Sequence, residues 1–148
     1  MNETYSPHRD VITKPDEVQL YQAVMADADE RPTWSLLRAA SYLKDNRLPP
    51  KGFQPKGDDT AHIAVRGVEN DANFHARSNG RDEVTYRIPL GEVRGRLVAE
   101  VELLYQSVPP EAVARLLRSS EPAAREFARL YARMETRPER VQASQMKF

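Results

Sequence analysis

The residues of this sequence that could bind a metal are histidines and carboxylates near the middle of the chain. Asp58 and Asp59 stand shortly before His62, and His75 follows in the next polar segment. Imidazole nitrogen and carboxylate oxygen are common ligands of Zn²⁺ and related ions. No H-E-x-x-H motif occurs, so a site would need distant segments to meet. We take these four residues as candidate metal ligands, with solvated or core-edge histidines as the alternative.

Two acidic stretches supply oxygen atoms of the kind that Ca²⁺ prefers. They are residues 27–30, with the letters DADE, and residues 70–73, with the letters NDAN. Ca²⁺ takes about six to eight oxygen ligands, and neither stretch has the glycine and glutamate positions of an EF-hand loop. Turn residues that hydrogen-bond to their own backbone would explain both stretches without an ion.

Other catalytic motifs are missing from the sequence. The chain has 0 cysteines, which excludes thiolate nucleophiles, disulfides and the C-x-x-C-H attachment of haem within this chain. Neither G-x-S-x-G nor a glycine-rich phosphate-binding motif occurs. We therefore predict that the chain is not an enzyme and holds no cofactor of its own, calcium being the alternative.

The charge balance and hydropathy limit the class of partner. The 22 basic side chains equal the 22 acidic ones, so the net charge is zero and a nucleic-acid partner is not expected. No apolar run approaches the ~20 residues of a membrane-spanning helix, so we expect no membrane insertion. The polar N-terminus, residues 1–14, shows no signal peptide.

Two groups of residues are candidates for binding a protein partner. Residues 44–60 are rich in proline and glycine and predict a long surface loop, which with the 69–82 loop would form a contact surface. The candidates in the first loop are Lys44, Asp45, Arg47 and Phe53. In the alternative, Asn46 and Arg47 only stabilise the loop, by donating hydrogen bonds to backbone carbonyls.

The second group is a ridge of arginines near the C-terminus. Arg125, Arg129 and Arg133 repeat every four residues, a spacing that continues to Arg137 and places like charges on one helix face. Such a ridge suits an anionic partner, and a solvated helix face is the alternative.

Alternation of apolar and polar residues predicts the fold. Residues 84–88 alternate, and a second run from Leu97 to Tyr105 places every second apolar side chain on one face and its glutamates on the other. We predict that the two runs pair as antiparallel strands with one buried face. The expected fold is mainly β, an antiparallel β-sandwich (jelly-roll-like) with one or two C-terminal helices.

The remaining segments complete this prediction. Residues 18–25 and 33–42 indicate a hairpin, with helix as the alternative, and residues 62–68 indicate a strand. Helices should begin near Pro110 and Pro122, and Pro138 should end the second. We expect residues 1–16 to form a flexible arm or linker, 17–138 a single domain, and 139–148 a frayed tail.

Three stretches together resemble a known family. They are YLKDNRLPPKGF at 42–53, DEVTYRI at 82–88 and ELLYQSVPP at 102–110. Their order and spacing resemble the C-terminal β-sandwich-like domain of bacterial exported multihaem c-type cytochrome-like proteins. The resemblance implies a periplasmic or otherwise exported location and a neighbouring haem domain. This chain departs from such proteins in having no haem-attachment motif and no signal.

The function expected from these observations is that of a non-catalytic accessory or interaction domain of a larger electron-transfer protein. Its partner would be a haem-bearing domain or a redox partner protein, as the resemblance implies. The alternative is a ligand-binding β-sandwich module, for carbohydrate or with a structural calcium ion.

Overall fold

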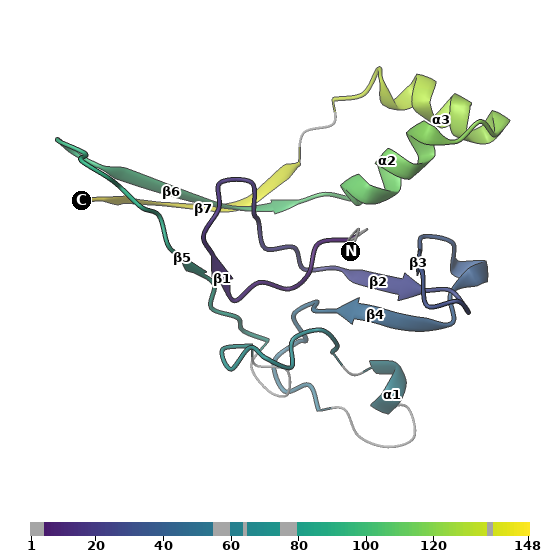
Figure 1. Ribbon diagram of the computed structural model, residues 1–148, viewed down its shortest axis with the longest axis horizontal. Coiled ribbons are helices and arrows are strands. Elements are labelled where there is room, and N and C mark those ends of the chain that lie inside the picture. Colours follow the sequence, from purple (N-terminus) through teal and green to yellow (C-terminus); the bar gives the residue numbers. More distant parts are fainter. Residues whose placement is uncertain (1–4, 55–59, 64, 75–79, 136–137) are drawn as a thin grey trace. The chain divides into compact units, whose positions relative to one another are not determined.

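The computed structural model describes residues 5–54, 60–63, 65–74, 80–135 and 138–148. The chain divides into two units, Met1–Pro89 and Leu90–Phe148. The first unit holds β1 to β5, the 3₁₀ turn η1 and the short helix α1, and the second holds β6, α2, α3 and β7 (Figure 1).

A three-stranded antiparallel sheet in the order β3–β2–β4 forms the centre of the first unit. Its strands are β2 (Ala23–Ala26), β3 (Pro32–Thr33) and β4 (Ser41–Asp45). Val24 and Ala26 are both 0% exposed and alternate with part-buried neighbours, as expected of a strand with one face in a core. Ile12, Val68 and Phe74 extend this core.

The predicted hairpin is confirmed in part. β2 overlaps the first predicted segment and β4 begins in the second, but η1 (Leu36–Arg38) interrupts that second segment. The turn between β2 and β3 uses the first acidic stretch. One oxygen of Asp27 accepts the backbone N–H groups of Asp29 and Arg31, both at 3.0 Å. This carboxylate therefore closes a turn, which was the alternative to a calcium ligand.

A second, parallel pair corrects two expectations about the first unit. β1 (Val11–Ile12) pairs with β5 (Thr85–Tyr86), so the expected N-terminal arm contributes a strand and residues 84–88 do not pair with 97–105. The predicted strand over 62–68 is also wrong. Its first residues belong to α1 (Thr60–Ile63), and Arg66 forms only an isolated bridge to Asp45.

The second unit consists of a two-stranded ribbon with a helix pair inserted between its strands. β6 (Val98–Tyr105) and β7 (Glu139–Lys147) pair antiparallel over their length, and α2 (Pro110–Arg118) and α3 (Pro122–Tyr131) connect them (Figure 1). The structure therefore has a strand where the sequence predicted a frayed tail.

The two C-terminal helices are confirmed. Each begins with proline in its first turn, where the missing N–H has no helical partner to lose. Val113 of α2 and Ala124 of α3 are buried, and the rings of Phe127 and Tyr131 stack with centroids 5.3 Å apart. α3 ends at Tyr131, well before Pro138. No helix in the described part of the chain is both long and apolar enough to cross a bilayer.

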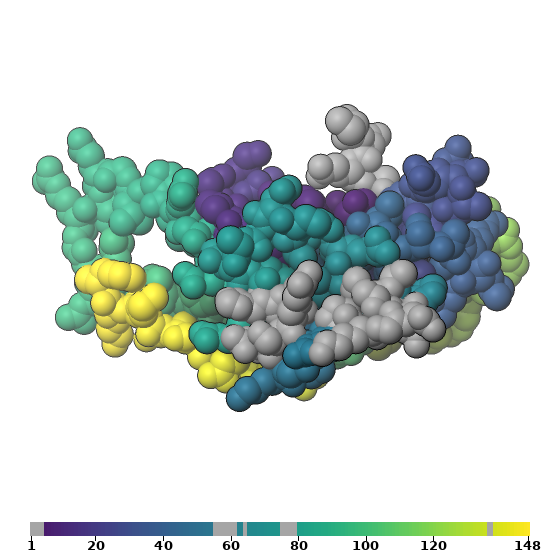
Figure 2. Space-filling view, turned by 90° about the horizontal axis from the view of Figure 1, so that it is seen from below, coloured from purple at the N-terminus to yellow at the C-terminus, as the bar shows by residue number. Residues whose placement is uncertain are grey.

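The predicted β-sandwich is wrong. Sheets within the described residues contain two or three strands, and none closes into a sandwich. The expected core face of β6 is open, since Val101 and Leu103 are each 52% exposed and Tyr105 is 58% exposed. The end of β7, yellow in Figure 2, likewise lies open on the face in view. Alternation correctly identified β6 as a strand, but its partner is β7 and not a strand of a second sheet.

Gly80 offers a test of how the first unit packs. Its φ is +55°, and a β-carbon there would collide with the backbone carbonyl of Pro49. Gly91 has almost the same φ, +57°, but has open space around it. We expect Gly91→Ala to cost about 1 kcal/mol through left-handed backbone strain. Gly80→Ala should cost about 2–3 kcal/mol, because the Pro49 backbone must also move. Urea unfolding measures both, and equal losses would contradict the close approach.

Candidate functional site

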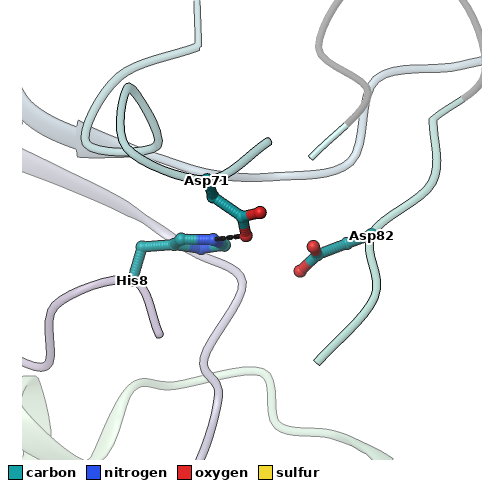
Figure 3. A group of neighbouring side chains, drawn as sticks. All are labelled: His8, Asp71 and Asp82. Carbon is teal, nitrogen blue, oxygen red and sulfur yellow. Dashed lines mark hydrogen bonds and ion pairs between the residues drawn. The ribbon is translucent and has the colours of Figure 1, made fainter. Parts of the chain in front are cut away.

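A histidine that the sequence analysis did not single out lies at the centre of a buried polar cluster in the first unit. His8 Nε2 lies 2.7 Å from Asp71 Oδ2, and the two side chains are 4% and 2% exposed (Figure 3). The edge of the His8 ring meets Phe74, with centroids 5.5 Å apart at 87°. His8 and Asp71 are 63 positions apart in the sequence, so no local spacing reveals the pair.

The other ring nitrogen of His8 faces two side-chain amides. Gln19 Nε2 lies 2.6 Å and Asn46 Nδ2 2.9 Å from His8 Nδ1. The orientation of each amide is set by its other contacts. Gln19 Oε1 accepts the backbone N–H of Arg9 at 3.0 Å. Asn46 Oδ1 accepts the N–H of Gln22 at 2.9 Å.

These contacts assign the tautomer of His8. If either amide were flipped, its NH₂ group would face a backbone N–H, so both amides present donors to Nδ1. Nδ1 therefore accepts, and the proton lies on Nε2, which donates to Asp71. Asn46 also donates to the Leu20 carbonyl at 2.8 Å. This agrees with the alternative stated for Asn46, a hydrogen bond to a backbone carbonyl.

Asp71 is held by backbone groups as well as by His8. Its Oδ1 accepts the N–H groups of Asn73 and Phe74 at 2.7 and 3.2 Å. Burial works to raise the pKa of Asp71, but the hydrogen bonds from His8 and from these two N–H groups outweigh it and leave the pKa below its usual value. Asp71 of the second acidic stretch, residues 70–73, therefore closes a turn of its own backbone, which was the alternative to a calcium ligand.

A third acid completes the cluster. Tyr21 donates to Asp82 Oδ2 at 2.6 Å, and burial followed by this hydrogen bond raises the pKa of the Tyr21 phenol. His8, Asp71 and Asp82 each bring one potential ligand atom within 4.8 Å of the others (Figure 3). A histidine that binds a metal through Nε2 normally carries its proton on Nδ1 and donates it to an acceptor. Here Nδ1 faces two N–H donors, so it cannot carry that proton. The hydrogen bonds therefore fit a structural network better than a metal site.

Of the four predicted metal ligands, His62 alone lies within the described residues. His62 lies in α1 and is exposed. Asp58, Asp59 and His75 lie outside the described residues.

A groove in the first unit brings together three of the predicted partner-binding residues. Asp45, Arg47 and Phe53 line a depression of about 350 Å³. Its other walls are apolar, formed by Leu48, Pro49, Pro50, Ile63 and Val65. Leu48 and Ile63 are 42% and 43% exposed, so the groove offers accessible apolar surface.

The polar edge of the groove is a bidentate ion pair. Arg47 donates from Nε and Nη2 to the two oxygens of Asp45, at 2.8 and 2.6 Å. These bonds raise the pKa of the Arg47 guanidinium, against a smaller opposing effect of burial. The Arg47 side chain is 61% exposed, while that of Asp45 is 13% exposed. The guanidinium is therefore fixed in place and still open to solvent.

The other predicted partner-binding residues lie elsewhere. Lys44 is 1% exposed, and its ammonium donates to the carbonyls of Ser6 and Leu20 at 2.8 and 2.9 Å, so it supports the fold and is not available at the surface. Arg125 and Arg129 are exposed on α3 in the second unit, and Arg133 follows the helix end. Arg129 is paired with Glu126 at 2.6 Å, which reduces the positive charge of the ridge.

No known protein family, curated protein or solved structure matches this chain. The site must therefore be interpreted from its own geometry.

Replacing Asn46 tests the network directly. Asn46→Ala leaves the Gln22 N–H without its acceptor and removes one of the two donors to His8. We expect a loss of about 2–4 kcal/mol in the free energy of unfolding, because buried polar groups lose their partners. Asn73→Ala is the control, since Asn73 is exposed and makes one side-chain hydrogen bond of 3.3 Å. A loss for Asn46→Ala no greater than for the control would contradict the network.

Asp71 should make stability depend on pH with a defined sign. A carboxyl whose pKa is lower in the folded state stabilises the fold above its unfolded pKa, about 3.9, and loses that contribution as the pH falls through the folded value. Asp71→Asn should therefore unfold more easily than the parent at neutral pH, with the difference shrinking in acid. Urea titrations at several pH values measure this. Asp29→Asn, at a 71% exposed side chain, is the control, and a gap that widens in acid would oppose the assignment.

Proposed function

We propose that this chain is a non-catalytic interaction domain that holds an extended segment of a partner protein in the groove beside Arg47. The observation that carries the proposal is that the groove gathers Asp45, Arg47 and Phe53 beside accessible apolar walls. A concave apolar surface with a few fixed polar groups is the usual form of a recognition site.

The chemistry of the groove narrows the class of partner segment. Pro49 and Pro50 restrict the backbone conformations of the groove wall. The wall therefore loses little conformational entropy when a segment packs on it. Arg47 has five N–H donors and uses one from Nε and one from Nη2 on Asp45, which leaves donors for an acceptor of the partner. The favoured segment therefore presents an apolar side chain and, next to it, a carboxylate.

The resemblance to exported cytochrome-like proteins supplies a setting for this proposal. In that setting the partner is a haem-bearing domain or a redox partner protein, and the location is periplasmic or otherwise exported. The parent reading frame tests the setting independently of the groove: a C-x-x-C-H motif in the same frame would support it, and a complete parent without one would count against it.

A display library of random dodecapeptides tests the binding mode. We expect selection on the intact chain to enrich peptides that carry an apolar residue beside an acidic one. Fluorescence anisotropy with one enriched, labelled peptide should show binding that weakens about tenfold or more for Arg47→Gln and for Phe53→Ala, since each removes a side chain that lines the groove.

Two matched variants serve as controls in the same unit. Arg31→Gln removes a guanidinium whose side chain is 77% exposed, and Leu37→Ala removes a 100% exposed apolar side chain. Both should bind the peptide as the parent does. The absence of any enriched peptide, or binding that weakens equally in the controls, would overturn the proposal. Thermal melts confirm that each variant is folded.

A further inference from the structure

The strand ribbon of the second unit, β6 and β7, is exposed along almost its whole length. Among the described residues β6 pairs only with β7, and every residue of both strands is exposed except part-buried Ala99. A two-stranded ribbon by itself is marginally stable in water, and a third strand or a packed face is normally needed. The ribbon is therefore a surface that gains stability when another strand is added.

The two edges of the ribbon are not equivalent. The pairing register shifts between Leu103 and Leu104, which leaves Val141 of β7 as an extra, unpaired residue. β7 also carries Arg140 and Lys147. Bulges and basic side chains are the devices by which proteins protect a free edge from pairing. β6 contains neither lysine, arginine nor proline, and its edge is the unprotected one.

The acidic side chains of β6 are engaged with β7. Glu102 pairs with Arg140 at 3.1 Å, and Glu100 accepts from Gln145 at 2.8 Å. Their charge is thus partly compensated within the ribbon, and they do not oppose a strand at the β6 edge as strongly as free glutamates would.

The backbone pattern fixes which residues of β6 can bond a new strand. Leu97 and Phe148 exchange both of their backbone hydrogen bonds, at 3.2 and 2.9 Å. Because the pattern alternates along an antiparallel pair, the N–H and C=O groups of Val98, Glu100 and Glu102 point away from β7. They form the row of backbone groups that another strand would meet.

Self-pairing of β6 satisfies both this pattern and the side chains. In a two-fold antiparallel pair centred on Glu102, Val101 lies opposite Leu103 of the second copy, and Ala99 lies opposite Tyr105. The apolar side chains of the two copies then lie on the same face of the sheet, and each smaller side chain lies opposite a larger one. Centring the pair on Val101 would instead set Glu100 against Glu102 twice. The first register has only one such contact, and Arg140 compensates each of its two glutamates.

We propose that two copies of this chain associate through the outer edge of β6, forming a continuous four-stranded antiparallel sheet centred on Glu102. The bulged, charged β7 strands become the outer edges of that sheet, which limits assembly to a dimer. This proposal concerns the second unit and does not depend on the groove of the first.

Analytical ultracentrifugation of the intact chain provides the first test. We expect a concentration-dependent dimer that Glu100→Pro converts to monomer, because proline removes an outward N–H and leaves the backbone hydrogen bonds between β6 and β7 in place. Ala143→Pro is the matched control, since Ala143 pairs with Glu102 and directs its N–H to the opposite edge. A parent that is monomeric at all concentrations, or a dimer that survives Glu100→Pro, would overturn the proposal.

Engineered thiols test the register. The chain has 0 cysteines, so a single introduced cysteine reports one contact. Glu102→Cys places two thiols opposite each other at the centre of the dimer and should give a covalent dimer on mild oxidation. Glu100→Cys separates its two thiols by about 13 Å along the strands and should not. Equal crosslinking of both variants, or crosslinking of Glu100→Cys alone, would contradict the register.

Discussion

The first unit depends on the imidazole ring of His8, both nitrogens of which form hydrogen bonds. His8 accepts from two amides at Nδ1 and donates to Asp71 from Nε2, and each of these partners is itself fixed by backbone groups. The ring thereby joins the N-terminal segment, the segment before β2, the end of β4 and the loop at Asp71. These polar groups are costly to bury singly, and together they are satisfied.

The candidate groove depends on the same constraint. Asn46, which contacts His8, lies between the two members of the ion pair at the groove edge, Asp45 and Arg47. Gly80 lies against the Pro49 carbonyl, two residues before Asp82 of the buried cluster. The buried network and the candidate groove are therefore formed by adjacent stretches of one chain, so contacts that hold the first also constrain the second.

The second unit has the opposite character. Apart from Val113 and Ala124, its described apolar side chains are exposed or part-buried, and its strands pair only with each other among the described residues. Such a unit gains more from a partner than from its own interior, because apolar surface left in water contributes nothing to folding. The groove proposed for one unit and the strand edge proposed for the other are two independent proposals for how this chain binds a partner.

Local signals in the sequence were sufficient for some elements of the fold. The two C-terminal helices follow from proline and an acid in or before the first turn and from an apolar stripe, which are all properties of neighbouring residues. Alternation likewise identified residues 98–105 as a strand. For the site, three residues suggested by the proline-rich segment, Asp45, Arg47 and Phe53, line one groove, whereas Lys44, suggested with them, is buried.

The sequence by itself determined the two C-terminal helices and the strand at 98–105, and that the chain has no cysteine chemistry. The tertiary structure decided the partners: β7 and not residues 84–88 for β6, β1 for β5, and Asp71 for His8. The physical reason is that alternation specifies which face a strand presents without specifying what will cover it. A hydrogen bond between side chains 63 residues apart likewise leaves no trace in the spacing of either neighbourhood.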